Sequence, residues 1–161
     1  MIRPAAPEDA AALAALYNYY VADTIVTFEE EPVAPEAFRT RIENITAVYP
    51  WLVDEADGEI AGYAYAGPWK ARHAYRFSTE CTVYIAPDHH GKGIGTALYT
   101  QLFAKLSAMS VRAVMAGIAL PNAGSIALHE KMGFKKVAHF KDVGWKFGKW
   151  IDVAYWQLIL D

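Results

Sequence analysis

The chain has 161 residues, 54% of them hydrophobic, which fits one domain with a sizeable core. Its net charge of -3 gives no general basic field for nucleic acid, and no apolar run approaches the roughly 18 residues of a membrane span. The single Cys81 excludes an intrachain disulfide and a cysteine-built zinc site. The first residues lack a signal-peptide pattern, so we expect a cytoplasmic protein. From length, charge and hydropathy together, we expect one domain over residues 1–161 with no nucleic-acid or membrane partner.

Strand and helix signals alternate in the first half of the chain. A short strand at residues 2–3 precedes Pro7, which begins a helix, and a second helix is expected after Pro35. The segment WLVDEADGEIAGYAYAG predicts two antiparallel strands joined by a turn at Asp57 and Gly58. Apolar positions of the first helix fall on one face, which comprises Leu13, Leu16, Tyr17 and Tyr20.

The second half continues the alternation. A strand is expected over FSTECTVYIA, a helix over residues 93–108, a strand over RAVMAGIAL and a helix over AGSIALHEKMGF that Gly133 ends. The aromatic tail alternates and turns at Gly148, as a final antiparallel pair would. This order predicts an α/β fold with helices on both faces of a sheet.

The segment PDHHGKGIGTAL, residues 87–98, places three glycines just before a predicted helix. The unpaired N–H groups and the positive dipole end of a helix start attract phosphate, and glycines allow it to approach the backbone. The segment lacks the Lys-Ser/Thr ending of a Walker loop and fits the dinucleotide fingerprint poorly. The alternative is a glycine-rich turn that binds nothing.

Two motifs resemble those of the GNAT N-acetyltransferases. HGKGIG, from His90 to Gly95, matches the pattern Arg/Gln-x-x-Gly-x-Gly/Ala except at His90, and NAGSIALHEKMGF matches the second signature. The chain also resembles the phosphinothricin N-acetyltransferases over nearly its whole length, through YPWLV, GEIAGYAYAGPWKARHAY, TECTVYI, LPN, LHEKMGF and GKWIDVAYWQL. The resemblance implies a mixed, mostly antiparallel, twisted sheet.

The resemblance also implies acetyl-CoA as co-substrate, no metal, and direct attack of a free amine on the thioester. The acceptor would be an amino-acid analogue such as phosphinothricin, methionine sulfone or methionine sulfoximine. The family's cofactor-binding positions match a strand, the glycine loop and a later helix start: Val83, Tyr84, Ile85, His90, Gly91, Lys92, Gly93, Ile94, Gly95, Thr96, Asn122 and Ser125.

Glu80 is a carboxylate in an otherwise apolar strand. Period-two alternation places Glu80, Thr82 and Tyr84 on one face of this strand. Partial burial raises a carboxyl pKa toward the range of a general base, and Glu80 matches the glutamate that the family uses in this way. The alternative is an edge charge or a structural ion pair.

His129 occupies a position where most superfamily members have a tyrosine that is thought to protonate the departing thiolate. The phosphinothricin group has histidine there too, so the resemblance implies a general acid or an orienting role. Core packing or a helix cap is the alternative. A metal site is not favoured, because the HE pair at His129 lacks the second histidine of a zinc-protease helix.

The basic residues just before the Glu80 strand are candidates for the acceptor site. Lys70 and Arg72 could bind the anionic groups of an amino-acid analogue, although a solvated basic loop is the alternative. The resemblance adds Tyr75 and Phe28, and a dimer interface nearby. We expect a homodimer with an aromatic tail, including Trp145, Trp150 and Trp156, near the subunit contact or the substrate mouth.

Two other functions share these features. A GNAT enzyme for a different small amine or a protein N-terminus would keep the cofactor motifs and change the pocket. A non-catalytic CoA-binding module would keep the glycine loop, but Glu80, Asn122 and His129 argue against it. The physiological acceptor does not follow from the sequence.

Overall fold

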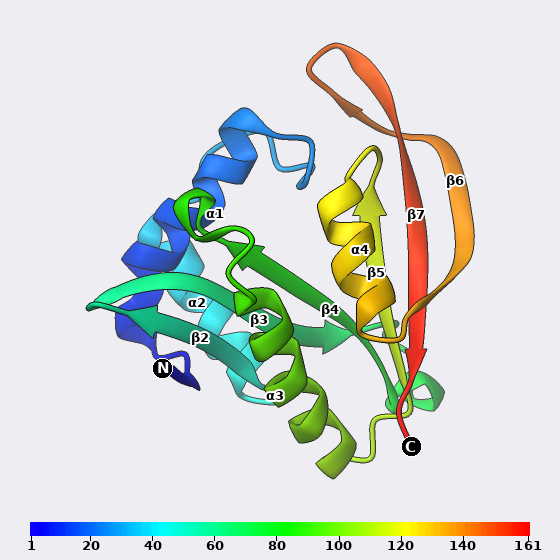
Figure 1. Cartoon of the computed structure of the whole chain (residues 1–161), viewed down its shortest axis with the longest axis horizontal. Coiled ribbons are helices and arrows are strands. Elements are labelled where there is room, and N and C mark those ends of the chain that lie inside the picture. The colour runs from blue at the N-terminus through cyan, green and yellow to red at the C-terminus, as the bar shows by residue number, and fades with distance from the viewer.

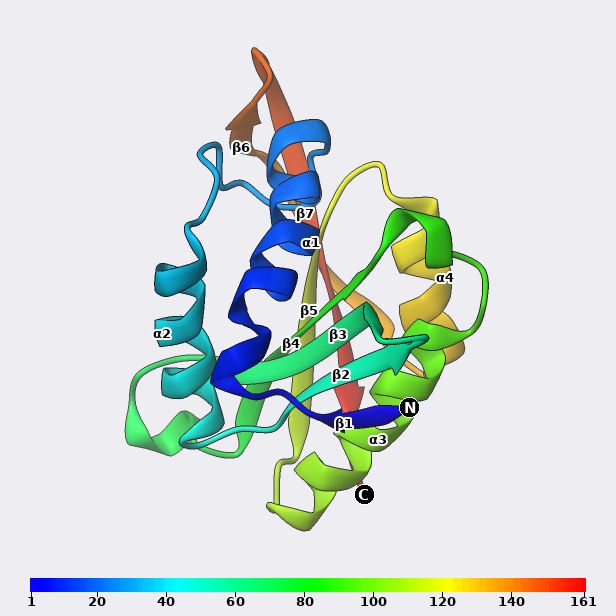
Figure 2. The ribbon, with the colours of Figure 1, turned by 90° about the vertical axis from the view of Figure 1, so that its left-hand side faces the viewer.

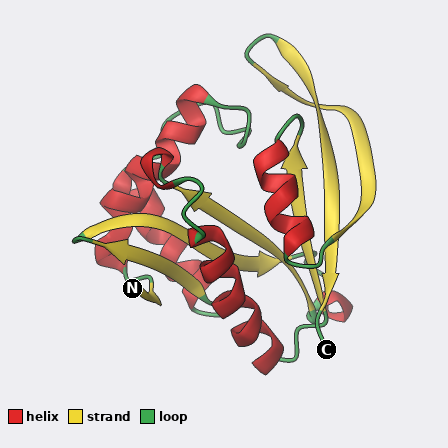
Figure 3. Cartoon of the chain, in the orientation of Figure 1, coloured by secondary structure: helices red, strands yellow, loops and turns green.

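One mixed sheet of seven strands runs through the computed structural model, which describes residues 1–161 (Figures 1 and 3). Three short 3-10 turns lie between the larger elements: η1 (Pro7–Asp9), η2 (His73–Tyr75) and η3 (Pro87–His89). The main elements in chain order are β1 (Ile2–Pro4), α1 (Ala10–Asp23), α2 (Pro35–Thr46), β2 (Trp51–Ala56), β3 (Glu59–Pro68), β4 (Ser78–Ile85), α3 (Ile94–Ala108), β5 (Ala113–Ala119), α4 (Ala123–Lys131), β6 (Lys135–Lys146) and β7 (Lys149–Ile159).

Helices cover both faces of the sheet, as the sequence predicted. Figure 2 shows α1 and α2 on one side and α3 and α4 on the other. Each side has its own apolar core, one around Leu98 and Leu102 of α3 and one around Leu13 of α1 and Ile42 of α2. The four residues predicted to form the inner face of α1 are all buried. No helix is long and apolar enough to cross a membrane.

The sheet has the order β1-β2-β3-β4-β5-β7-β6, and every neighbouring pair is antiparallel except β4 and β5. These two parallel strands pair only from Ser78 to Glu80 on β4 and from Ala113 to Met115 on β5. Beyond these residues they diverge (Figure 1). The facing edges of residues 81–85 and 116–119 therefore have no strand partner, and their backbone polar groups are available to a ligand.

Candidate active site

The glycine loop lies between η3 and the start of α3. Gly91 and Gly93 have φ angles of 74° and 79°, in the left-handed region that glycine adopts without strain. Gly95 lets α3 and α4 approach, because a Cβ there would lie 2.9 Å from the Leu128 side chain. The N–H groups of residues 91–96 have no backbone acceptor. This cluster of free donors at a helix start has the chemistry of a phosphate cradle.

His90 fastens the beginning of this loop to α1 and β4. Its Nε2 lies 2.8 Å from the Tyr20 hydroxyl and 3.1 Å from the Ile85 carbonyl oxygen. The Tyr20 hydroxyl in turn donates to the same carbonyl at 2.5 Å. The side chain that departs from the family pattern therefore bonds to the protein itself and fixes the position of the loop.

A cavity of about 260 Å³ lies between the diverging strands. Residues from β4, β5 and α4 line it, among them Thr82, Val83, Tyr84, Ala116, Gly117, Ile118, Asn122 and Ser125. Asn122 caps α4, because its Oδ1 accepts from the N–H of Ser125 at 3.1 Å. Of the residues predicted to bind the cofactor, the structure gathers Val83, Tyr84, Asn122 and Ser125 here. Ile85 and residues 90–96 line neither this cavity nor the next one.

His129 lies in the wall of this cavity and is only 3% exposed. Its Nδ1 is 2.7 Å from the carbonyl oxygen of Ser125, which can only accept, so Nδ1 carries the proton. Its Nε2 then accepts from the Tyr99 hydroxyl at 2.9 Å, and Tyr99 accepts from the Cys81 thiol at 3.4 Å. Burial lowers the pKa of His129, which favours this neutral form.

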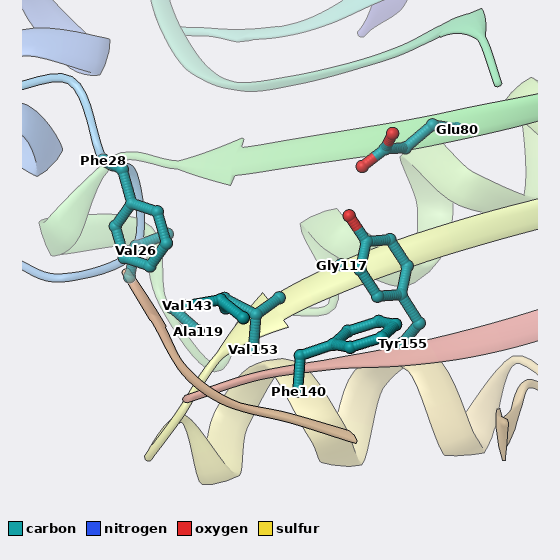
Figure 4. Close-up of a pocket in the computed structure, with 9 residues that line it drawn as sticks. All are labelled: Val26, Phe28, Glu80, Gly117, Ala119, Phe140, Val143, Val153 and Tyr155. Atoms are coloured by element: carbon teal, nitrogen blue, oxygen red, sulfur yellow. The ribbon is translucent and has the colours of Figure 1, made fainter. Parts of the chain in front are cut away.

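A second cavity of about 410 Å³ adjoins the first. Figure 4 shows its walls, which come from the loop after α1 and from β4 to β7. Seven of its nine lining residues are hydrophobic, and no lysine or arginine lines either cavity. Glu80 lines both cavities, together with Val26, Phe28, Gly117 and Ala119. The carboxylate therefore lies where the two spaces meet, at the point where β4 and β5 separate.

The environment of Glu80 changes its proton affinity. Burial raises the pKa of the Glu80 carboxyl, and the positive charge of Lys70 opposes this rise. Glu80 forms no salt bridge or side-chain hydrogen bond with another residue. The structural ion pair that the sequence left open is therefore absent, and the carboxylate faces the cavities.

Tyr155 of β7 is a site residue that the sequence reasoning missed. Its hydroxyl and the Glu80 carboxylate point into the same space (Figure 4). Burial and the nearby Glu80 charge raise the pKa of Tyr155, which keeps the hydroxyl protonated. Gly117 makes room for the ring, since a Cβ there would lie 3.0 Å from it. The available signal was the period-two pattern of β7, which places Tyr155 on the other face of the strand from Ala154 and Trp156.

The predicted acceptor residues are divided between the cavity and the surface. Phe28 lines both cavities. Lys70, Arg72 and Tyr75 are exposed and line neither one, although Lys70 is near enough to act on the Glu80 charge. Lys70 instead lies 5.0 Å from the centre of the Trp69 ring. The structure thus brings Phe28 and Glu80 together and leaves the basic cluster outside.

The structure separates the three tryptophans of the aromatic tail. Trp156 is buried against α3 and α4, and its Nε1 donates to Glu130 at 3.3 Å, so its side chain is not part of an exposed surface. Trp145 and Trp150 are 51% and 63% exposed. No group of three or more His, Cys, Asp or Glu side chains is arranged to hold a metal ion.

Comparison with known proteins identifies the family. The family described as "Acetyltransferase (GNAT) domain" matches residues 2–155. The chain is 42% identical over 156 residues to the phosphinothricin N-acetyltransferase of Streptomyces viridochromogenes, covering 97% of this chain and 85% of that protein. It is 36% identical to the L-methionine sulfoximine/L-methionine sulfone acetyltransferase of Salmonella typhimurium, covering 99% and 94% of the two chains.

A solved structure agrees with these relatives. The phosphinothricin acetyltransferase of Sinorhizobium meliloti, in complex with AcCoA, superposes with a TM-score of 0.96 at 35% identity, covering 99% of this chain and 88% of that one. The mostly antiparallel sheet, the glycine loop and the opening between β4 and β5 occur here in one chain that the family matches over nearly its full length. The chain therefore belongs to the GNAT acetyltransferase family and is an acyltransferase.

Proposed function

We propose that this protein acetylates the free amine of a small amino-acid-like acceptor, such as phosphinothricin, methionine sulfoximine or methionine sulfone. Acetyl-CoA is the acyl donor. The observation that carries the proposal is the position of Glu80 at the junction of the two cavities. One cavity opens along unpaired strand edges, and the other has largely apolar walls and one carboxylate.

The donor side has groups that suit each part of acetyl-CoA. The free N–H groups at residues 91–96 would hold the pyrophosphate. The unpaired edge of β4 offers backbone donors and acceptors to the amides of the pantetheine arm, and Asn122 and Ser125 lie across the cavity from it. Acetyl-CoA supplies the activated acetyl group, and the chain orients it toward Glu80.

Glu80 is the proposed general base. An amine is protonated at neutral pH and must lose a proton before it can attack a thioester. The partly buried carboxylate has a raised pKa and no competing ion pair, so it can take that proton directly or through a water molecule. The Tyr155 hydroxyl, protonated and facing the same space, would orient the acceptor.

The nucleophiles near the cavities are poorly suited to an acyl-enzyme route. Burial raises the pKa of Cys81 to about 12, and its thiol hydrogen is directed to Tyr99. Ser125 lacks a base, because the Nδ1 of His129 already donates to a backbone carbonyl. We therefore propose direct transfer from the thioester to the amine.

His129 has an orienting role in this scheme. In the neutral form its Nε2 holds the hydrogen of Tyr99, so the imidazole has no free proton to give to a thiolate. Tyr99, which also lines the first cavity, is the group that carries the hydrogen. In our proposal His129 is therefore not the general acid that the sequence predicted. It orients Tyr99, whose hydroxyl carries the hydrogen.

The apolar walls of the second cavity suit the aliphatic arm of a methionine-like acceptor. We retain Lys70, Arg72 and Tyr75 as proposed contacts for its anionic groups at the mouth of the site. A thiol-release assay with acetyl-CoA should show turnover of phosphinothricin, methionine sulfoximine and methionine sulfone. Turnover of polyamines or peptide N-termini alone would favour the other acceptor classes, and binding of CoA without turnover of any amine would favour a non-catalytic module.

Lys70 should set the acid limb of the pH profile. Its charge holds the pKa of Glu80 below the value that burial alone would produce, so Lys70→Met should raise that pKa further. The base form would then be lost at a higher pH, and the acid limb of kcat/KM should shift upward. Steady-state rates between pH 5 and about 8 would measure the shift at low salt. Lys131→Met, at an exposed lysine of α4, is the control, and an identical acid limb in all three proteins would contradict the assignment.

We also propose that two copies associate through the exposed aromatic face of the β6–β7 hairpin. Trp145 and Trp150 pair across the hairpin with ring centres 4.7 Å apart and remain more than half exposed. Large exposed apolar groups on one face mark a contact surface. Light scattering should report the mass of a dimer for the wild type and of a monomer for Trp145→Glu/Trp150→Glu. A wild-type monomer at assay concentration would overturn this part of the proposal.

A further inference from the structure

Most of the β6 strand is exposed, and two of its residues are buried. Of its twelve residues, only Gly144 and Lys146 are buried. They are two positions apart, so they lie on one face of the strand, opposite the exposed Trp145. Both contact the connection between α1 and α2, which carries Phe28. The hairpin is thus attached to the wall of the acceptor cavity at two adjacent points.

Lys146 is a buried cation that forms no salt bridge, although the negative charge of Glu30 acts on it. Its side chain is 1% exposed, and its ammonium group donates to the carbonyl oxygens of Val21 at 2.7 Å and Thr27 at 2.8 Å. Val21 is in the last turn of α1, where carbonyl groups lack helical partners and a cation is favourable. Thr27 directly precedes Phe28. One ammonium therefore joins β6, the end of α1 and the Phe28 segment.

Gly144 forms the second contact. A Cβ at this position would lie 2.3 and 2.4 Å from atoms of the Phe28 ring, so the ring rests directly on the glycine backbone. Phe28 lines both cavities at the junction with Glu80. Any side chain at position 144 would displace the ring. Because Phe28 lines the cavity of about 410 Å³, this displacement would change the shape of that cavity.

The geometry points to Gly144 and Lys146 as positioning residues for the acceptor site. They hold the Phe28 side chain, which forms part of the cavity wall (the Phe28 wall), in place relative to Glu80. Neither residue touches the reacting atoms. Lys146 fixes the backbone next to Phe28, and Gly144 fixes the depth of the ring. The inference deepens the proposed function and rests on it, because it assigns the second cavity to the acceptor.

Lys146→Met removes the three donors and keeps much of the side-chain volume. We expect kcat/KM for phosphinothricin to fall about 10- to 100-fold, since small misplacements of a positioning group have effects of this size. The loss should appear mainly in the acceptor KM and less in the KM for acetyl-CoA, because residues 91–96, which would hold the pyrophosphate, line neither of the cavities that Phe28 lines. Lys149→Met, at an exposed lysine of the same hairpin, is the matched control.

Hydrogen exchange tests, independently of catalysis, whether Lys146 holds the segment that carries Phe28. Backbone amides of residues 22–30 should exchange faster in Lys146→Met than in the wild type, with residues 90–96 unchanged. If the wild type acetylates no acceptor, the proposed function fails while the exchange result still decides whether Lys146 holds the segment. Unchanged exchange, an unchanged acceptor KM, or an equal rise in both KM values would overturn the inference.

Gly144→Ala keeps the inference testable if Lys146→Met does not fold. The added methyl group must push the Phe28 ring, so the acceptor KM should rise more than the KM for acetyl-CoA. A folded Gly144→Ala enzyme with the wild-type acceptor KM would show that the Phe28 wall does not define the acceptor site.

Discussion

Glu80→Gln should lower kcat about 10²- to 10⁴-fold near neutral pH, the range that loss of a general base produces. Glutamine is nearly isosteric and keeps hydrogen bonding, but it cannot take a proton from the ammonium group of the acceptor. Part of the rate should return at high pH, where the amine loses its proton to solvent. Steady-state thiol release across the pH range measures both effects.

The stability of the same variant separates catalysis from structure. Burial raises the folded pKa of Glu80, so the charged form is disfavoured in the folded state. The stabilising contribution of a group with a raised folded pKa is present below its unfolded pKa and is lost as pH rises through the folded pKa. At neutral pH the charged Glu80 therefore destabilises the fold, and Glu80→Gln should have an unchanged or higher Tm.

Glu59→Gln is the matched control, because Glu59 is an exposed glutamate at the start of β3. It should retain wild-type kcat. A Glu80→Gln enzyme with wild-type kcat across the pH range would show that the proton leaves by another route. A sharply lower Tm together with the lost activity would indicate a structural charge instead.

Gly93→Glu should weaken acetyl-CoA binding by about tenfold or more, which is about 1.4 kcal/mol or more. The substitution places a negative charge beside the free N–H groups where the pyrophosphate would bind. It also forces a residue with a side chain into a backbone conformation with a φ of 79°, which costs about 1–2 kcal/mol. Isothermal titration with acetyl-CoA measures the loss.

Gly58→Glu isolates the electrostatic part of this effect. Gly58 has a φ of 80° and, like Gly93, no atom within 4 Å of a Cβ added to it, so the backbone strain is matched. Gly58 lies in the turn between β2 and β3, outside the glycine loop, and lines neither cavity. We expect Gly58→Glu to lose a similar amount of stability and keep its affinity for acetyl-CoA. Equal affinities in the two variants would place the pyrophosphate elsewhere.

Much of the fold follows from local sequence signals. The turns at Gly58 and Gly148 and the end of α4 at Gly133 all have φ values between 72° and 96°, so glycine marks each boundary for a conformational reason. Helical and period-two spacing then separates helices from strands. The count of aromatic residues did not separate Trp156 from the exposed tryptophans, whereas the alternation of β7 places Trp156 with Ala154 on the core side.

The site was less predictable because it depends on distant parts of the chain. The residue pattern and the family motifs led to Glu80, and the structure places it between the cavities. Lys146 carried no such signal, because its two acceptors are 125 and 119 residues earlier in the chain. Arg72 is close to β4 in sequence, but η2 follows it directly and the residues of this connection lie exposed. Nearness in sequence therefore did not translate into nearness to the cavity.

The mass of the reaction products tests the central claim most directly. The enzyme is mixed with acetyl-CoA and phosphinothricin, and both the small molecules and the intact protein are weighed by mass spectrometry during early turnovers. Direct transfer at the Glu80 junction predicts one acetyl group on the amine of the acceptor, none on the protein, and little product with Glu80→Gln. An acetylated protein that passes its acetyl group to the acceptor, or no acetylated acceptor at all, would contradict the account.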